Sequence, residues 1–207
     1  MHLLAVAVAL TAPPSSSFVA RIDNPWLPFR PGTTYVYRGV RDGKPSRDVV
    51  RVTSRKTVID RVRCTAVEDR LYLSGRLRER TTDWYAQDAK GNVWYYGEAT
   101  AELDRSGRVT STEGSWRAGR DGAKAGIVMP ARPRVGQAFR QEYYKGHAED
   151  HFRIIRITGR RLLTKEWTPL EPGVVDHKLY VRGVGMVREE TIKGDDERAR
   201  LVTVRRG

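Results

Sequence analysis

Apolar and polar side chains alternate in short runs along the chain from residue 33 onward. The runs "TTYVYRG" (33–39), "DVVRVTSRKTVI" (48–59) and "VRCTAVEDRLYL" (62–73) have the period of two that is typical of β-strands with one buried face. Turn-forming segments such as "RDGKPS" (41–46) and "SG" (74–75) separate them, and the second of these predicts a tight hairpin. The pattern recurs at residues 76–87, 92–97, 100–104, 108–112, 115–119, 137–146, 150–158, 161–168, 174–183, 185–194 and 199–206.

These runs predict an all-β protein of roughly twelve strands, joined by tight turns into an antiparallel meander. So many twisted strands curl, and we therefore expect a barrel or a half-open barrel. One connection, "RAGRDGAKAGIVMPARPRVG" (117–136), is a long Gly/Pro-rich loop with an apolar patch. It suggests either a lid over one end of the barrel or a crossover that covers the sheet edge.

The N-terminus, "MHLLAVAVALTAPPSSSF", has an apolar run too short to span a bilayer and of the length of a signal-peptide core. Ser15 and Ser17 suit the small positions of a cleavage site, although the usual basic start is missing. We expect residues 1–21 to be an export signal or a disordered N-terminus and residues 22–207 to be a single β-rich domain, soluble and secreted or extracytoplasmic. The alternative is that the apolar run is the first element of the domain.

Residues 83–98, "DWYAQDAKGNVWYYGE", place five aromatic rings in one predicted hairpin. With a four-residue loop, Trp84 and Tyr95 share a face with Ala86 and Val93, and this face is the expected core. The other face carries Asp83, Tyr85, Trp94 and Tyr96, which suits a ligand-contacting wall. The alternative is that the rings only stabilise the sheet through cross-strand pairs.

The chain is strongly basic, with a net charge of +13 and a sequence pI near 10.2. Eight of its 38 basic residues are lysines and the rest are arginines, with dense clusters at 152–165 and 198–207. This charge suggests an anionic partner, either an anionic polymer or an anionic membrane surface, and no motif indicates specific nucleic-acid binding. The alternative is a coding bias toward arginine, with no partner involved.

Few residues suggest catalysis or metal binding. Cys64, the only cysteine, lies in an alternating run and is expected to be a buried, inert thiol. His147 and His151 flank two acidic residues, but in an extended chain they are spread too far to close one metal shell. His177 has no accompanying nucleophile motif. We therefore expect no catalytic residues, no metal site and no cofactor.

Several phrases carry a resemblance, namely "DNPWLPFRPGTTYVY", "DWYAQDAKGNVWYYGE", "GIVMPARPRVGQAFRQEYYKG" and "KEWTPLEPGVVDHKLYVRGVGMV". In these the chain resembles a family of uncharacterised secreted bacterial proteins of actinobacterial type. The resemblance covers nearly everything after residue 22. It implies export and a β-rich fold and brings no activity with it. More loosely, the expected curved sheet is similar to half-barrel lipoprotein carriers, a likeness of fold alone.

Together these observations predict a secreted, non-enzymatic barrel or half-barrel that binds an amphipathic or aromatic ligand, such as a lipid, at the cell envelope. The ligand-binding residues expected from the aromatic hairpin, the long loop and the remaining tryptophans are Trp84, Tyr85, Trp94, Tyr96, Trp116, Met129 and Trp167. The alternative is a hydrolase or lyase that acts on an anionic cell-surface polymer, with arginines holding the substrate and a carboxylate or His177 as acid or base.

Overall fold

The computed structural model describes residues 12–207, and these form β-strands and one short 3₁₀ turn, η1 (Ser15–Ser17). The sixteen strands are β1 (Phe18–Val19), β2 (Thr34–Arg41), β3 (Lys44–Ile59), β4 (Val62–Leu73), β5 (Arg76–Asp88), β6 (Val93–Leu103), β7 (Val109–Ser111), β8 (Trp116–Arg117), β9 (Lys124–Met129), β10 (Ala138–Arg140), β11 (Glu142–Tyr143), β12 (His151–Thr158), β13 (Arg161–Trp167), β14 (Val175–Val181), β15 (Gly185–Lys193) and β16 (Arg198–Arg205). No helix within these residues is long and apolar enough to cross a bilayer.

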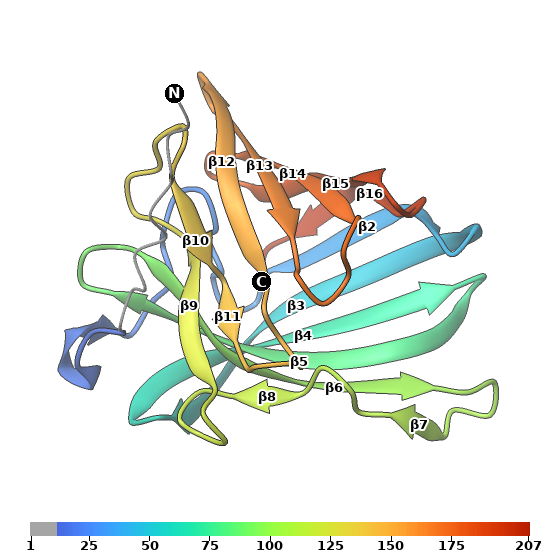
Figure 1. Cartoon of the computed structure of the whole chain (residues 1–207), viewed down its shortest axis with the longest axis horizontal. Helices are drawn as coiled ribbons and strands as arrows, with labels where there is room; N and C mark the ends of the chain where they lie inside the picture. The colour runs from blue at the N-terminus through green and yellow to red at the C-terminus, as the bar shows by residue number, and fades with distance from the viewer. Residues whose placement is uncertain (1–11) are drawn as a thin grey trace.

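The strands form one antiparallel sheet that curls into a nearly closed barrel (Figure 1). Its order is β10-β12-β13-β14-β15-β16-β2-β3-β4-β5-β6-β9-β11, and eight of these twelve pairs of neighbours are consecutive strands. The prediction of an all-β antiparallel meander curled into a barrel is confirmed. The strand number exceeds the expected twelve because β1, β7, β8, β10 and β11 are pieces of two or three residues.

Two-residue turns set the register of three long hairpins. Asp42–Gly43, Asp60–Arg61 and Ser74–Gly75 all have positive φ at both positions, between 45° and 80°. Such turns match the right-handed twist of the flanking strands. They fix which residues of β2–β5 point inward, because a slip of one residue would move every side chain to the opposite face.

The two ends of the sheet meet at a seam between β9 and β12, where the barrel is nearly closed. The segment 138–143 pairs with β12 through β10 and then, after Gln141, with β9 through β11. Gly126 on β9 allows this close crossing, since a Cβ there would lie 2.2 Å from the carbonyl oxygen of Arg140. The long segment 117–136 therefore contains a strand, β9, that extends the sheet beyond β6. The segment is the expected crossover at the sheet edge and not a lid over the barrel.

The N-terminal residues that the structure describes join the outer face of the sheet. β1 pairs with the end of β5, and Phe18 packs edge-on against Trp94 and Tyr96 at centroid distances of 6.4 and 5.6 Å. Most of the apolar run that predicts an export signal lies outside the described residues, and the division at residue 21 stays a prediction.

Residues 22–32, here called the floor segment, cross one end of the barrel. Asn24 anchors the segment: its side-chain amide donates to the carbonyl oxygens of Gly91 and Pro130, and its backbone N–H donates to Gln87. Trp26 and Leu27 are buried, and the carbonyl oxygen of Pro25 accepts from the N–H of Gly183 in the β14–β15 turn. The floor segment therefore plugs this end of the barrel with apolar side chains.

Candidate functional site

A cavity of about 220 Å³ lies inside the barrel above the floor segment. One wall comes from β2–β5 and the facing wall from β14 and β15, while Leu27 and Phe29 lie at the base. The volume is many times that needed for a single water molecule and suits a small organic molecule. The lining residues are Leu27, Phe29, Tyr35, Tyr37, Asp48, Val50, Val67, Asp69, Asp83, Tyr85, Val128, Gln141, Lys178, Tyr180, Gly185, Met186 and Glu189.

Aromatic rings form much of the apolar part of this lining, and two of the tyrosine hydroxyls are bonded to the backbone. The hydroxyl of Tyr35 donates to the carbonyl oxygen of Pro28 at 3.0 Å, and that of Tyr37 donates to Met186 at 3.1 Å. Tyr85 packs against Phe29 at a centroid distance of 5.0 Å. Because both ends of these side chains are fixed, the rings present rigid faces to the cavity.

Carboxyl groups line the same cavity on the β3–β5 wall. Alternation along each strand brings Asp48, Asp69 and Asp83 inward on three adjacent strands. Burial, together with the neighbouring Asp48, raises the pKa of Asp69 well above its usual range. Burial also raises the pKa of Asp83 to about 7, although a hydrogen bond from the Tyr95 hydroxyl at 2.6 Å opposes the shift. Atom Oδ1 of Asp48 is buried without a hydrogen-bond partner in the described structure.

Two more acids, the half-buried Glu98 and the buried Glu142, lie toward the seam and outside the cavity lining. Burial and the nearby Asp83 raise the pKa of Glu98 to about 9. Burial and Asp150 raise the pKa of Glu142 to about 8, and its Oε2 atom has no hydrogen-bond partner among residues 12–207 although the residue is only 6% exposed. These groups share one cause: carboxylates have been taken from water and no cation has been placed beside them.

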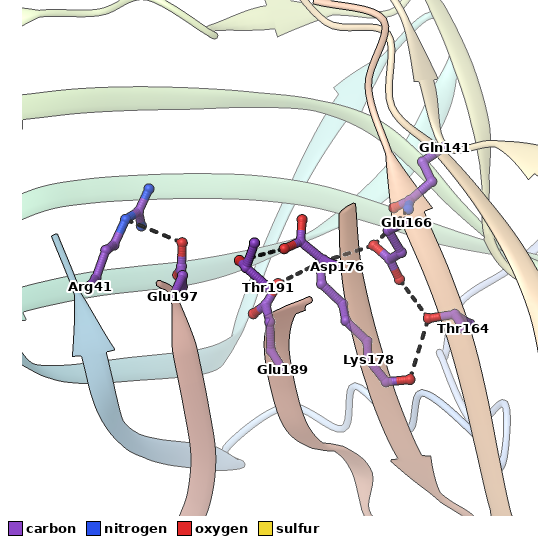
Figure 2. A network of polar contacts seen from close by, with 9 residues as sticks. All are labelled: Arg41, Gln141, Thr164, Glu166, Asp176, Lys178, Glu189, Thr191 and Glu197. Atoms are coloured by element: carbon purple, nitrogen blue, oxygen red, sulfur yellow. Dashed lines mark hydrogen bonds and ion pairs between the residues drawn. The ribbon is translucent and has the colours of Figure 1, made fainter. Parts of the chain in front are cut away.

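Among residues 12–207, Lys178 on the facing wall is the only basic residue in the cavity lining. Its Nζ lies 3.0 Å from Glu166 Oε2 and 3.1 Å from Glu189 Oε1 (Figure 2). Burial alone would lower the pKa of Lys178, yet the two carboxylates raise it well above its usual range. One cation thus serves two anions. The other buried acids have no such partner, and their raised pKa values mean that they hold their protons more strongly than they would in water.

Further polar contacts extend from this triad across the inner wall (Figure 2). Thr164 Oγ1 lies 2.8 Å from Glu166 Oε1, and Gln141 Nε2 donates to Glu166 Oε2 at 2.9 Å. Toward β2, Thr191 donates to Asp176 at 2.6 Å and Arg41 pairs with Glu197 at 3.5 Å. The inside of the barrel is therefore apolar near the floor segment and polar toward the end where the β2–β3 and β15–β16 hairpins turn.

The aromatic hairpin differs from its predicted register by one residue. Tyr85 pairs with Tyr95 rather than with Trp94, and the two rings stack at 4.8 Å. The Asp88 carboxylate causes the longer loop, since it accepts from the N–H groups of Lys90 and Asn92. The inward face therefore carries Asp83, Tyr85 and Tyr95, and the outward face carries Trp84, Trp94 and Tyr96.

Of the seven residues predicted to contact a ligand, Tyr85 lies in the cavity lining. Trp84, Trp94 and Tyr96 are buried on the outward side with Cys64, where Phe18 and Ala12 pack against the cluster, and burial raises the pKa of the Cys64 thiol to about 12.

The other three predicted residues lie outside the cavity lining. Trp116 lies beside Glu98, Met129 packs among interior core residues, and Trp167 stacks on His151 at 5.5 Å. A ligand-binding role for these residues stays a prediction.

Sequence reasoning did not single out Asp48, Asp69, Lys178 or Glu189 as site residues. A usable signal was present, because Asp48 has the same parity as the half-buried Val50 and the buried Val52, and Asp69 has the same parity as the buried Val67. A charged residue in the inward register of a strand indicates a polar interior.

The candidate metal ligands do not converge. His147 stacks on Tyr144 in a turn, His151 stacks on Trp167, and the Glu149 carboxylate accepts from the N–H of Gly146. Within residues 12–207 no group of three His, Cys, Asp or Glu side chains is placed to hold a metal ion.

No protein-family profile and no curated protein matches the chain. Two solved structures are similar in fold. A candidate exported protein with a YmcC-like fold from Bacteroides fragilis has 14% identity and a TM-score of 0.48, covering 87% of this chain and 99% of its own. A candidate lipoprotein from Parabacteroides distasonis has 10% identity and a TM-score of 0.45, covering 88% and 99%. These values carry no inference about function, and they do not support the actinobacterial part of the resemblance.

Proposed function

We propose that this chain is a non-enzymatic, extracytoplasmic barrel that binds a small amphipathic ligand in its interior cavity. The observation that carries the proposal is that aromatic rings line the same cavity as the carboxyl groups of Asp48, Asp69 and Asp83. Rings of this kind bind an apolar or aromatic body. Buried carboxylates without a counter-charge bind a cation, and the ring faces add a cation–π contribution.

The ligand that fits is therefore a small molecule with one aromatic ring and a protonated amine. The apolar body would lie near Phe29 and Tyr85, toward the floor segment, and the amine would lie among the carboxylates. Lys178 does not compete with this amine, because its charge is already shared between Glu166 and Glu189.

The alternative of polymer hydrolysis finds less support. In that mechanism arginines hold an anionic substrate next to a carboxylate acid or base. The carboxylates described above point into the barrel, whereas Arg38 of β2, the arginines of β16 and His177 alternate to its outside. Substrate-holding and catalytic groups on opposite faces of one sheet do not share a cleft.

Equilibrium binding of three matched probes tests the proposal. We expect 2-phenylethylamine to bind at least tenfold more tightly than 2-phenylethanol, a difference of about 1.4 kcal/mol, and 3-phenylpropanoate not to bind measurably. The change Asp83→Asn removes one carboxylate from the cavity, and Asp42→Asn removes the same group from an exposed turn. The proposal is supported if Asp83→Asn loses the preference for the amine and Asp42→Asn keeps it. Equal binding of all three probes to the parent protein would refute it.

A further inference from the structure

Four arginines lie directly opposite one another on four adjacent strands. Arg188 on β15 pairs with Arg200 on β16, Arg200 pairs with Arg38 on β2, and Arg38 pairs with Arg47 on β3. We call this row the arginine ladder. It crosses the wall formed by β15, β16, β2 and β3 (Figure 1). With neighbouring strands about 4.8 Å apart, its ends are roughly 14 Å apart.

All four side chains point away from the barrel interior. Their strand neighbours Glu189, Tyr37 and Asp48 line the cavity, and alternation therefore places the arginines outside. Arg38, Arg47 and Arg200 are exposed and Arg188 is half-buried.

The ladder is poorly neutralised. Arg188 is 4.0 Å from Glu190, and among residues 12–207 no carboxylate lies within 4 Å of the guanidinium groups of the other three. The guanidinium of Arg47 lies over the ring of Tyr72, 5.1 Å from its centroid, which holds that end of the ladder in place. Like charges directly opposite on neighbouring strands destabilise a sheet, so the row lowers stability unless an anion lies along it.

We propose that the arginine ladder binds a linear acidic polysaccharide carrying one carboxylate per sugar. A hexopyranose unit is close in length to the spacing between strands, and successive carboxylates can therefore meet successive guanidiniums. Each such contact is the planar, paired geometry that arginine forms with carboxylates. This site is on the outer face and is independent of the proposed interior ligand.

The shape of the surface favours a polymer over a membrane. The ladder runs across the strands, around the circumference of the curled sheet (Figure 1). A flat bilayer touches a convex surface along a narrow strip and cannot reach all four guanidiniums equally. A flexible chain can follow the curvature.

Binding of polygalacturonate oligomers as a function of salt tests the proposal. The variant Arg38→Gln/Arg200→Gln removes the centre of the ladder, and Arg132→Gln/Arg134→Gln removes the same charge from the exposed segment between β9 and β10. We expect the ladder variant to bind at least tenfold more weakly at low salt. The slope of log affinity against log salt should fall by about two, and the control variant should keep the parent slope to within about one half.

Three results would overturn the proposal. The first is an equal loss in both variants, which would assign binding to net charge alone. The second is unchanged binding in the ladder variant. The third is ladder-dependent binding to phosphatidylglycerol vesicles without ladder-dependent binding to polygalacturonate. Far-UV circular dichroism and a cooperative urea transition show that the variants are folded. Neither control uses the interior ligand, so failure here is separate from failure of the proposed interior function.

Discussion

The Lys178 triad is the feature of the interior whose energetic consequence can be worked out most directly. The change Lys178→Met keeps most of the length of the side chain and removes its charge. It leaves the carboxylates of Glu166 and Glu189, whose side chains are only 9% and 23% exposed, without the ammonium group that lies 3.0 and 3.1 Å away. Removing one partner of a buried ion pair costs about 3–5 kcal/mol. Because the Lys178 side chain is 26% exposed, we expect the lower end, about 3 kcal/mol.

Urea unfolding at pH 7 measures this cost. A loss of about 3 kcal/mol is a large share of the 5–15 kcal/mol that holds a typical domain together, and it lowers the midpoint by about 1 M or more. The triple change Lys178→Met/Glu166→Gln/Glu189→Gln removes both anions as well and should regain most of the stability. Arg188→Met is the control, because it breaks an exposed pair with Glu190 and should cost less than about 1 kcal/mol. A Lys178→Met variant as stable as the control would refute the claim that this part of the interior is desolvated.

Three further predictions follow from the buried acids and the seam. The pKa values of Asp83, Glu98 and Glu142 are raised in the folded state to about 7, 9 and 8, so the folded protein binds more protons than the unfolded chain above about pH 4. The free energy of unfolding should therefore fall as pH rises from 5 to 8, and urea titrations showing the opposite slope would contradict the burial of these groups. Tyr95→Phe removes the hydrogen bond to Asp83 and should raise the pKa of that carboxyl further, as read from its carboxyl ¹³C shift; an unchanged or lower value would count against the contact. Gly126→Val places a side chain against the backbone of the closing segment and should destabilise by several kcal/mol or prevent folding. Gly136→Val, in open space but with the strain of a positive φ, should cost less; equal cost in thermal unfolding would show that the crossing is not tight.

The sequence was sufficient for the fold because one face of each strand is buried. Alternation at 33–39, 48–59 and 62–73 predicted the meander, and the Ser74–Gly75 turn was placed correctly because it has the chemistry of a two-residue hairpin. The main strand that it missed is the six-residue β9, which lies in the segment 117–136 predicted as a loop. The run 137–146, predicted as one strand, is divided into β10 and β11, because its two halves pair with different strands.

The site was harder to predict than the fold. The aromatic hairpin was recognised, but its register depends on the Asp88 carboxylate, whose loop contacts are not visible in a pattern of apolar and polar residues. Because the observed register differs from the predicted one by one residue, Tyr95 rather than Trp94 lies on the same face as Tyr85. The arginine ladder depends on the register of three strand pairs, two of which join residues about 10 and 160 positions apart in the sequence. Only the assembled sheet shows that the basic charge is aligned.

The central claim is that the interior cavity binds a small cationic, aromatic ligand. The most direct measurement is an NMR titration of the isotope-labelled protein with 2-phenylethylamine. The account predicts shifts concentrated at the cavity, with Tyr85, Tyr180 and Met186 among the residues affected, and their loss in Asp83→Asn. Shifts confined to the outer surface, or identical shifts with 2-phenylethanol and in the Asp83→Asn variant, would contradict it.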